Sequence, residues 1–124
     1  MTYKMKTTDN KHIDLTYLKQ LANGSNQFII EMISVFMEQN PMEVASLEKY
    51  LKNKDWKSLH SVAHKMKPSF SFMGIKELES VIKLVNEYSA TETNLNLLPE
   101  MISKIKTICK EALKELELEK KLFL

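Results

Sequence analysis

DWKSLHSVAHKMKPSFSFMG, residues 55–74, holds an amphipathic pattern that is typical of a bundle helix. At about 100° per residue, its apolar side chains fall on one stripe, made of Leu59, Val62, Ala63, Met66, Phe70 and Met73. Asp55 precedes the stripe as a good N-cap, and Gly74 follows it as a residue that easily takes the left-handed conformation at a helix end. The pattern therefore predicts a helix over 55–72 with one face buried in a core.

A short helix is expected near the start of the chain. Asp14 is a good N-cap, and Ile13 and Leu18 have the spacing of a hydrophobic staple. The helix should stop at Asn23 and Gly24, because glycine accommodates the left-handed backbone that ends many helices.

A long helix is expected next, from Ser25 as N-cap to about Leu51. Pro41 interrupts this segment, so that either Asn40 caps a second helix or a single helix kinks at the proline. The apolar stripe continues on both sides of Pro41 without loop-like residues between. We therefore expect one kinked helix.

Two further helices complete the prediction. One covers about 75–89, a polar loop covers 90–96, and the last helix begins near Asn96 or Pro99 and runs to about Lys121. Four long amphipathic helices with short links predict an antiparallel four-helix bundle, preceded here by one short helix.

The composition agrees with an all-α protein of one domain. A chain of 124 residues fits a single domain, so we expect one domain over 1–124 with its core bundle over about 25–121. Two glycines and three prolines are too few for the turns of a sheet protein. Cys109 is the only cysteine, which excludes an internal disulfide, and it lies beside the apolar stripe of the last helix. Its thiol is expected to be buried and inert.

The location is predicted from what the sequence lacks. The first ten residues have no apolar core of a secretory signal, and no apolar run is long enough to cross a membrane. Together with the unpaired cysteine, these features predict a cytoplasmic protein with no membrane partner. The start at Met1 favours a free-standing protein over a segment of a hybrid kinase.

The charges argue against a nucleic-acid partner. All eighteen basic residues are lysines, and the formal net charge is only +2. Without arginine the chain lacks the bidentate contact that reads guanine. The lysines are nevertheless concentrated, because the segment from Lys49 to Lys67 holds six of them and one acid, Asp55. That segment would attract an anionic ligand or an acidic protein face.

His64 is the most informative candidate for chemistry. It projects about 160° away from the centre of the apolar stripe, so it is displayed on the open face of its helix, beside His60, Lys67 and Ser71. Three interpretations are open: an ordinary solvated face, a metal site, or nucleophilic phosphoryl chemistry. His60 and His64 have the spacing to grip a metal ion, but Lys65 and Lys67 would repel it, and we expect no metal. A neutral imidazole is a competent nucleophile, and Lys67 would neutralise phosphoryl oxygens.

The motif around His64 resembles the signature of histidine-containing phosphotransfer domains, A-H-x-L-K-G-S with a glycine ten residues after the histidine. The matching residues are Ala63, His64, Met66, Lys67, Ser69 and Gly74. The resemblance extends to a D-L-x-Y-L pattern at residues 14–18, an F-x-x-x-M-I-x-x-F pattern at residues 28–36, and the D-W pair at residues 55–56.

This resemblance implies a four-helix bundle and a function. His64 would accept a phosphoryl group on Nε2 from a receiver-domain aspartate and pass it to another receiver. The domain would carry the group without kinase activity of its own and without a cofactor, because Mg²⁺ belongs to the receiver. The implied partners are the receiver domains of a hybrid histidine kinase and of a response regulator, met by a monomer. The alternative function is a non-phosphorylated helical adaptor that binds or sequesters a receiver.

Two positions depart from the family pattern. Pro68 replaces a common glycine, and Asn86 stands where several members carry a glutamine that binds the imidazole. Asn86 points about 40° and Glu79 about 60° from Ile82 on the inner stripe of their helix, and polar groups so close to the core should have partners. Two interpretations of Asn86 are open: it orients the His64 ring, with Glu79 as the competing candidate, or it is a helix-edge asparagine bonded to water. We expect Asn86 to act with His64 and Lys67 at the reacting centre.

Receivers are expected to dock around His64 and on the preceding short helix. The docking residues implied by the motif are His60, Lys65, Pro68, Ser71, Phe72 and Gly74. Phe72 lies about 120° from the apolar stripe, and two placements are open for its ring. The ring either offers apolar contact to a receiver or packs against a neighbouring helix.

Overall fold

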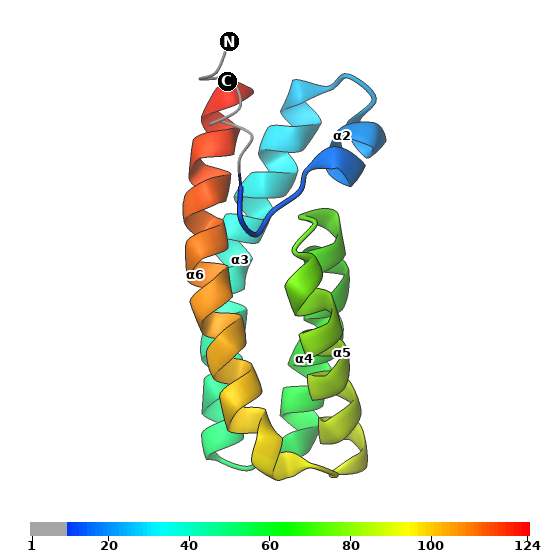
Figure 1. Ribbon diagram of the computed structural model, residues 1–124, viewed down its shortest axis with the longest axis vertical. Helices are drawn as coiled ribbons and strands as arrows, with labels where there is room; N and C mark the ends of the chain where they lie inside the picture. The colour runs from blue at the N-terminus through cyan, green and yellow to red at the C-terminus, as the bar shows by residue number, and fades with distance from the viewer. Residues whose placement is uncertain (1–9) are drawn as a thin grey trace.

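The computed structural model describes residues 10–124, and within them the chain is helical with no strand (Figure 1). The elements are α2 (Thr16–Ala22), α3 (Asn26–Lys52), α4 (Trp56–Phe72), α5 (Lys76–Thr91), the short 3₁₀ helix η1 (Leu95–Leu97) and α6 (Leu98–Leu122). The all-α prediction is confirmed. None of these helices is long and apolar enough to cross a membrane.

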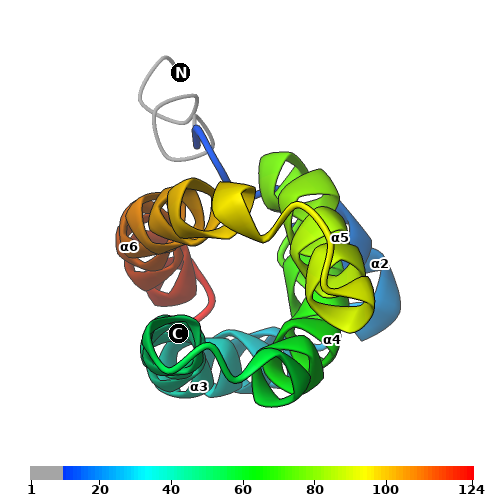
Figure 2. The same cartoon turned by 90° about the horizontal axis from the view of Figure 1, so that it is seen from below.

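Four long helices form the predicted antiparallel bundle. Viewed from below, α3, α4, α5 and α6 surround one common core in that order (Figure 2). The short helix α2 lies beside the start of α3, above the end of the α4–α5 hairpin (Figure 1). No other helix of residues 10–124 covers the outer face of α4, where His64, Pro68 and Ser71 are exposed. We call this face the open side of α4.

Side-chain caps explain where two of the helices begin. Ser25 Oγ accepts a hydrogen bond from the Phe28 N–H at 3.1 Å at the start of α3. Asp55 Oδ1 accepts one from the Ser58 N–H at 3.2 Å at the start of α4. Both predicted N-caps are therefore confirmed, and each satisfies a donor that the first helical turn would otherwise leave free.

The start of α2 differs from the prediction by one residue. The N-cap is Leu15, without a side-chain hydrogen bond. Asp14 instead folds its carboxylate over the next turn, where Oδ1 accepts from the Thr16 N–H at 3.0 Å and from the Thr16 hydroxyl at 2.7 Å. Aspartate often makes such local turns in competition with capping.

Both internal prolines lie inside continuous helices. The helix α3 runs unbroken through Pro41, which confirms the prediction of one helix instead of two, while the kink expected at Pro41 stays a prediction. The helix α4 likewise runs unbroken through Pro68. The last helix begins at Leu98 with Pro99 in its first turn, between the two predicted starts and where a missing N–H costs least.

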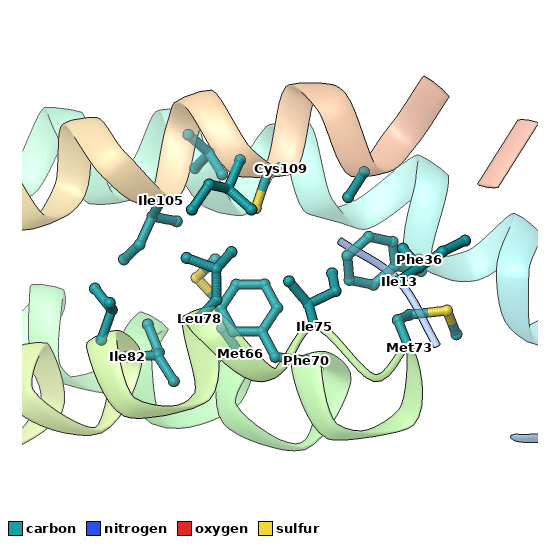
Figure 3. Packing of buried hydrophobic residues seen from close by; sticks show 14 of the residues in the cluster. Ile13, Phe36, Met66, Phe70, Met73, Ile75, Leu78, Ile82, Ile105 and Cys109 are labelled. Atoms are coloured by element: carbon teal, nitrogen blue, oxygen red, sulfur yellow. The ribbon is translucent and has the colours of Figure 1, made fainter. Parts of the chain in front are cut away.

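The core is packed between the α4–α5 pair and the α3–α6 pair. Figure 3 shows side chains of α4 and α5 pointing toward Ile105 and Cys109 of α6. The rings of Phe36 and Phe70 meet edge to face with centroids 6.5 Å apart. Cys109 is 2% exposed, so the predicted burial of its thiol is confirmed, and this burial raises the pKa of the thiol to about 11.

Gly74 is required by the frame of the bundle. It has φ +63°, and a Cβ there would lie only 2.0 Å from the Asp14 carbonyl oxygen. The Asp14 N–H donates to the Met73 carbonyl at 3.1 Å in the same place. The geometry thus places Gly74 against the N-terminal segment, and its expected part in receiver docking stays a prediction.

The segment before α2 is fastened to α5 and α6 through His12. Its Nδ1 is hydrogen-bonded to Glu77 of α5, and its Nε2 lies 2.6 Å from Glu111 of α6. Burial lowers the pKa of His12, but these two hydrogen bonds and the charges of Glu77 and Glu115 outweigh it, so the pKa is raised above 6.5. Glu115 also accepts from the backbone N–H groups of Lys11, His12 and Ile13.

Candidate functional site

His64 lies on the open side of α4, as its helical position predicted. Its neighbours Ala63 and Met66 are fully buried, so packing of the inner face forces His64 outward, where it is exposed. Its ring has no hydrogen-bond partner among residues 10–124. An exposed imidazole with free nitrogens is available for attack on a substrate that approaches from solvent.

The turn after His64 is shaped by Pro68. Proline has no N–H, so it cannot make the helix hydrogen bond to the His64 carbonyl four residues earlier. The helix continues regardless, and Pro68 and Ser71 are both exposed. This places a compact ring, without a flexible side chain, directly beside His64 on the open side.

His60 is held differently from His64, although it lies one turn away. It is half-buried, and its Nδ1 lies 3.0 Å from the Asn86 carbonyl oxygen of α5. The rings of His60 and His64 are stacked, with centroids 6.1 Å apart and planes inclined by 29°. Residues 10–124 contain no group of three or more side chains placed to hold a metal ion.

Lys67 lines a groove between α4 and α5. The groove has a volume of about 530 Å³, and its other walls are Pro68, Ser71, Glu79, Ser80, Ile82 and Lys83. A position on the open side of α4 predicts an exposed Lys67, but the residue is half-buried. Its side chain therefore forms part of the groove wall one turn after His64.

Lys83 is a site residue that sequence reasoning missed. It lies on α5 and lines the same groove as Lys67. The contacts from His60 to Asn86 and from Ser71 to Glu79 fix the antiparallel register of the two helices, and in this register Lys83 is level with the segment from His64 to Lys67. Counting outward from the turn at Gly74 could have found it, because residues equally distant from a tight turn lie side by side in a helical hairpin.

The two candidates for orienting His64 have other contacts. The Asn86 carbonyl accepts from His60, while its Oδ1 is buried and has no partner within residues 10–124. Glu79 Oε1 accepts a hydrogen bond from Ser71 Oγ at 3.4 Å. The structure therefore brings Asn86 to His60 through the backbone, and the orienting role of its side chain stays a prediction.

The α3 side of the site carries mixed charge. Lys65 is exposed, and Glu43 of α3 is half-buried nearby. Burial raises the pKa of Glu43, and the positive charge of Lys65 opposes this rise. The open side of α4 is therefore bordered by a carboxyl group toward α3 and by Lys67 and Lys83 toward α5.

An aromatic pair joins α2 to the end of α4. Phe72 is half-buried, and its ring stacks on Tyr17 with centroids 6.0 Å apart and planes inclined by 19°. Tyr17 is 49% exposed and Leu21, one turn later on α2, is 45% exposed. Phe72 thus packs against a neighbouring helix, and the apolar contact area on this side comes from the pair together with α2.

The family comparison agrees with this geometry. The family model described as Hpt domain matches residues 31–117, which is most of the chain, so the chain belongs to the Hpt family of histidine phosphotransfer domains. Its function is histidine phosphotransfer in a phosphorelay, and such domains carry phosphoryl groups and are not kinases. They interact with receiver domains. Searches of the curated proteins and of the solved structures found no significant match.

Proposed function

We propose that His64 is the phosphoryl carrier of this domain, accepting the group from a receiver-domain aspartate and passing it to a second receiver. The observation that supports this most strongly is the position of His64. Within a chain of the Hpt family, it is the histidine of the A-H-K-M-K-P-S motif, and it is exposed on the open side of α4. His12 is engaged with glutamates, and His60 is tied to α5.

The transfer step requires a particular tautomer of His64. The Nε2 lone pair attacks phosphorus, the N–P bond forms, and the P–O bond to aspartate breaks as the carboxylate leaves with the electron pair. Nε2 has that lone pair only when the ring proton lies on Nδ1. The reverse sequence returns the group to an aspartate of the next receiver. Little other covalent chemistry is needed, so placement and charge govern the rate.

Lys67 and Lys83 supply positive charge for the group in transit. Both line the groove beside His64, and ammonium groups stabilise phosphoryl oxygens. We propose that this chain holds no cofactor and that Mg²⁺ comes with the receiver. Charge neutralisation by a metal is part of phosphoryl transfer in general, and the lysines beside His64 would oppose a cation bound on this side.

Receivers are proposed to dock on the open side of α4 and on α2. The polar part is formed by Lys65 and Ser71 around His64, with the compact ring of Pro68 between them, and all three residues are exposed. The apolar part is formed by Tyr17 and Leu21 of α2, next to Phe72. A partly apolar patch with a polar rim has the composition of a transient protein interface.

Asn86 is proposed to orient the His64 ring, with Glu79 as the competing candidate. A buried amide oxygen without a partner is unusual, and the Nδ1–H group of His64 is the partner that this proposal gives it. Asn86→Leu should then slow transfer several-fold, whereas Asn86→Gln should keep or raise the rate. Slow transfer in Glu79→Leu with a normal rate in Asn86→Leu would move the role to the glutamate.

We further propose that the protein acts as a cytoplasmic monomer. Its partners would be the receivers of a hybrid histidine kinase and of a response regulator, without nucleic acid or membrane. An unpaired, buried Cys109 fits a reducing compartment. A monomer keeps the open side of α4 free for two receivers in succession.

The proposal is tested with a receiver that carries a radiolabelled phosphoryl group. Label should move to the wild-type chain, and the product should be labile in acid and stable in base, as a phosphoramidate is. His64→Gln should take no label, while His60→Ala should still reach most of the wild-type extent. Label on His64→Gln would refute the assignment, and binding without any transfer of label would favour the adaptor.

A further inference from the structure

The stacked pair of histidines on α4 has an asymmetric environment. His60 is half-buried and His64 is exposed, while their ring centroids lie 6.1 Å apart and the ring planes are inclined by 29°. Aromatic rings at this separation attract each other. The His60 ring, which is the inner one, therefore limits the space in which the outer His64 ring can rotate.

A second helix fixes the inner ring. His60 Nδ1 lies 3.0 Å from the Asn86 carbonyl oxygen, which also accepts from Ser89 Oγ at 3.1 Å. A carbonyl oxygen only accepts hydrogen bonds, so Nδ1 of His60 must carry a proton and donate it. The hydrogen bond thus sets both the protonation of Nδ1 and the direction in which the His60 ring faces.

We propose that His60 is a positioning residue for His64, which rests on the proposed role of His64 as the phosphoryl carrier. Pinned to α5 through Asn86, the His60 ring restricts the rotation of the His64 ring by stacking against it. His60 makes and breaks no bond in the reaction. By restricting this rotation, His60 holds the reacting nitrogen of His64 in one orientation for more of the time. The rate of phosphoryl transfer depends strongly on the orientation of the reacting groups.

Three substitutions separate the two contacts of His60. His60→Leu removes both the ring and the donor. His60→Phe keeps a ring but has no donor for the Asn86 carbonyl, and His60→Asn keeps a donor at the same number of bonds from the backbone but has no ring. Lys57→Ala, an exposed change in the first turn of the same helix, is the matched control. Thermal unfolding shows which variants keep the fold.

Two measurements are made on each variant. The first is the mobility of the His64 ring, taken from nuclear magnetic relaxation of its C–H groups. The second is the rate at which phosphoramidate labels His64, with attack by Nε2 on phosphorus, cleavage of the P–N bond and departure of ammonia. Neither measurement needs a receiver, and the first needs no phosphoryl group.

We expect the His64 ring in His60→Leu to become more mobile and the labelling rate to fall about two- to tenfold, the range of one aromatic contact. His60→Phe and His60→Asn should fall between His60→Leu and the wild type, and Lys57→Ala should match the wild type. An unchanged ring mobility in His60→Leu, or slower labelling without a change in mobility, would overturn the inference. Failure of wild-type His64 to take label would instead refute the proposed function, while the mobility data would still decide the role of His60.

Discussion

Replacing Gly74 with alanine should destabilise the bundle more than a glycine substitution at another helix end. The alanine Cβ would lie 2.0 Å from the Asp14 carbonyl oxygen and 2.8 Å from its carbon, so the backbone at Asp14 must move. Alanine in the left-handed region costs about 1–2 kcal/mol, and displacement of Asp14 weakens its hydrogen bond to the Met73 carbonyl, which contributes about 1 kcal/mol. We therefore expect Gly74→Ala to lose about 2–3 kcal/mol of unfolding free energy.

Gly24→Ala is the matched control for this prediction. Gly24 also has positive φ, +91°, but a Cβ there would meet no heavy atom within 4 Å. Its substitution should cost only the conformational part, about 1–2 kcal/mol. Urea unfolding followed by circular dichroism gives both free energies under one set of conditions. Equal losses in the two variants would refute the reasoning that the contact between Gly74 and Asp14 fixes the N-terminal segment.

Three further predictions concern charge, docking and pH. Lys67→Ala should slow transfer from a phosphorylated receiver about tenfold, which is about 1.4 kcal/mol of transition-state stabilisation. Lys83→Ala should slow transfer less, because the Lys83 side chain is exposed. Rapid-quench kinetics measures both rates, and wild-type rates in both variants would contradict the prediction. Ser71→Glu should weaken receiver binding measured by calorimetry while Ser103→Glu, an exposed change on α6, leaves it unaltered, and equal affinity in both would place docking elsewhere. The pKa of His12 is raised above 6.5 in the folded protein, so its contribution to stability is fully present below pH 6.5 and is lost as the pH rises through the folded pKa. The unfolding free energy should therefore depend less on pH in this window in His12→Asn than in the wild type. The same pH dependence in both proteins would contradict the role of His12.

Much of the fold follows from local signals in the sequence. Ser25 and Asp55 cap their helices as predicted, because capping depends on residues within one turn. The unbroken helix through Pro41 also followed from the continuous apolar stripe. The start of α2 differs by one residue from the prediction, because the Asp14 carboxylate can either cap the helix or form a local turn with Thr16, and it forms the turn. Local sequence alone does not determine which use is favoured.

The site was predicted where helical periodicity is sufficient. The outward direction of His64 follows from the buried stripe on the opposite side of one helix. The half-burial of Lys67, the contribution of Lys83 and the bond from His60 to Asn86 depend on how far α5 slides along α4. The role of Gly74 likewise depends on a distant segment, since its closest neighbour is Asp14. Such contacts require the tertiary register, which the pattern of a single helix does not contain.

The central claim is that Nε2 of His64 carries the phosphoryl group. The most direct test is the nuclear magnetic resonance spectrum of the phosphorylated protein with isotope-labelled histidine, in which phosphorus couples to the nitrogen that it is bonded to. We predict a single phosphorus–nitrogen coupling, at Nε2 of His64, with none at His12 or His60. A coupling at Nδ1 of His64 or at another histidine would contradict the account.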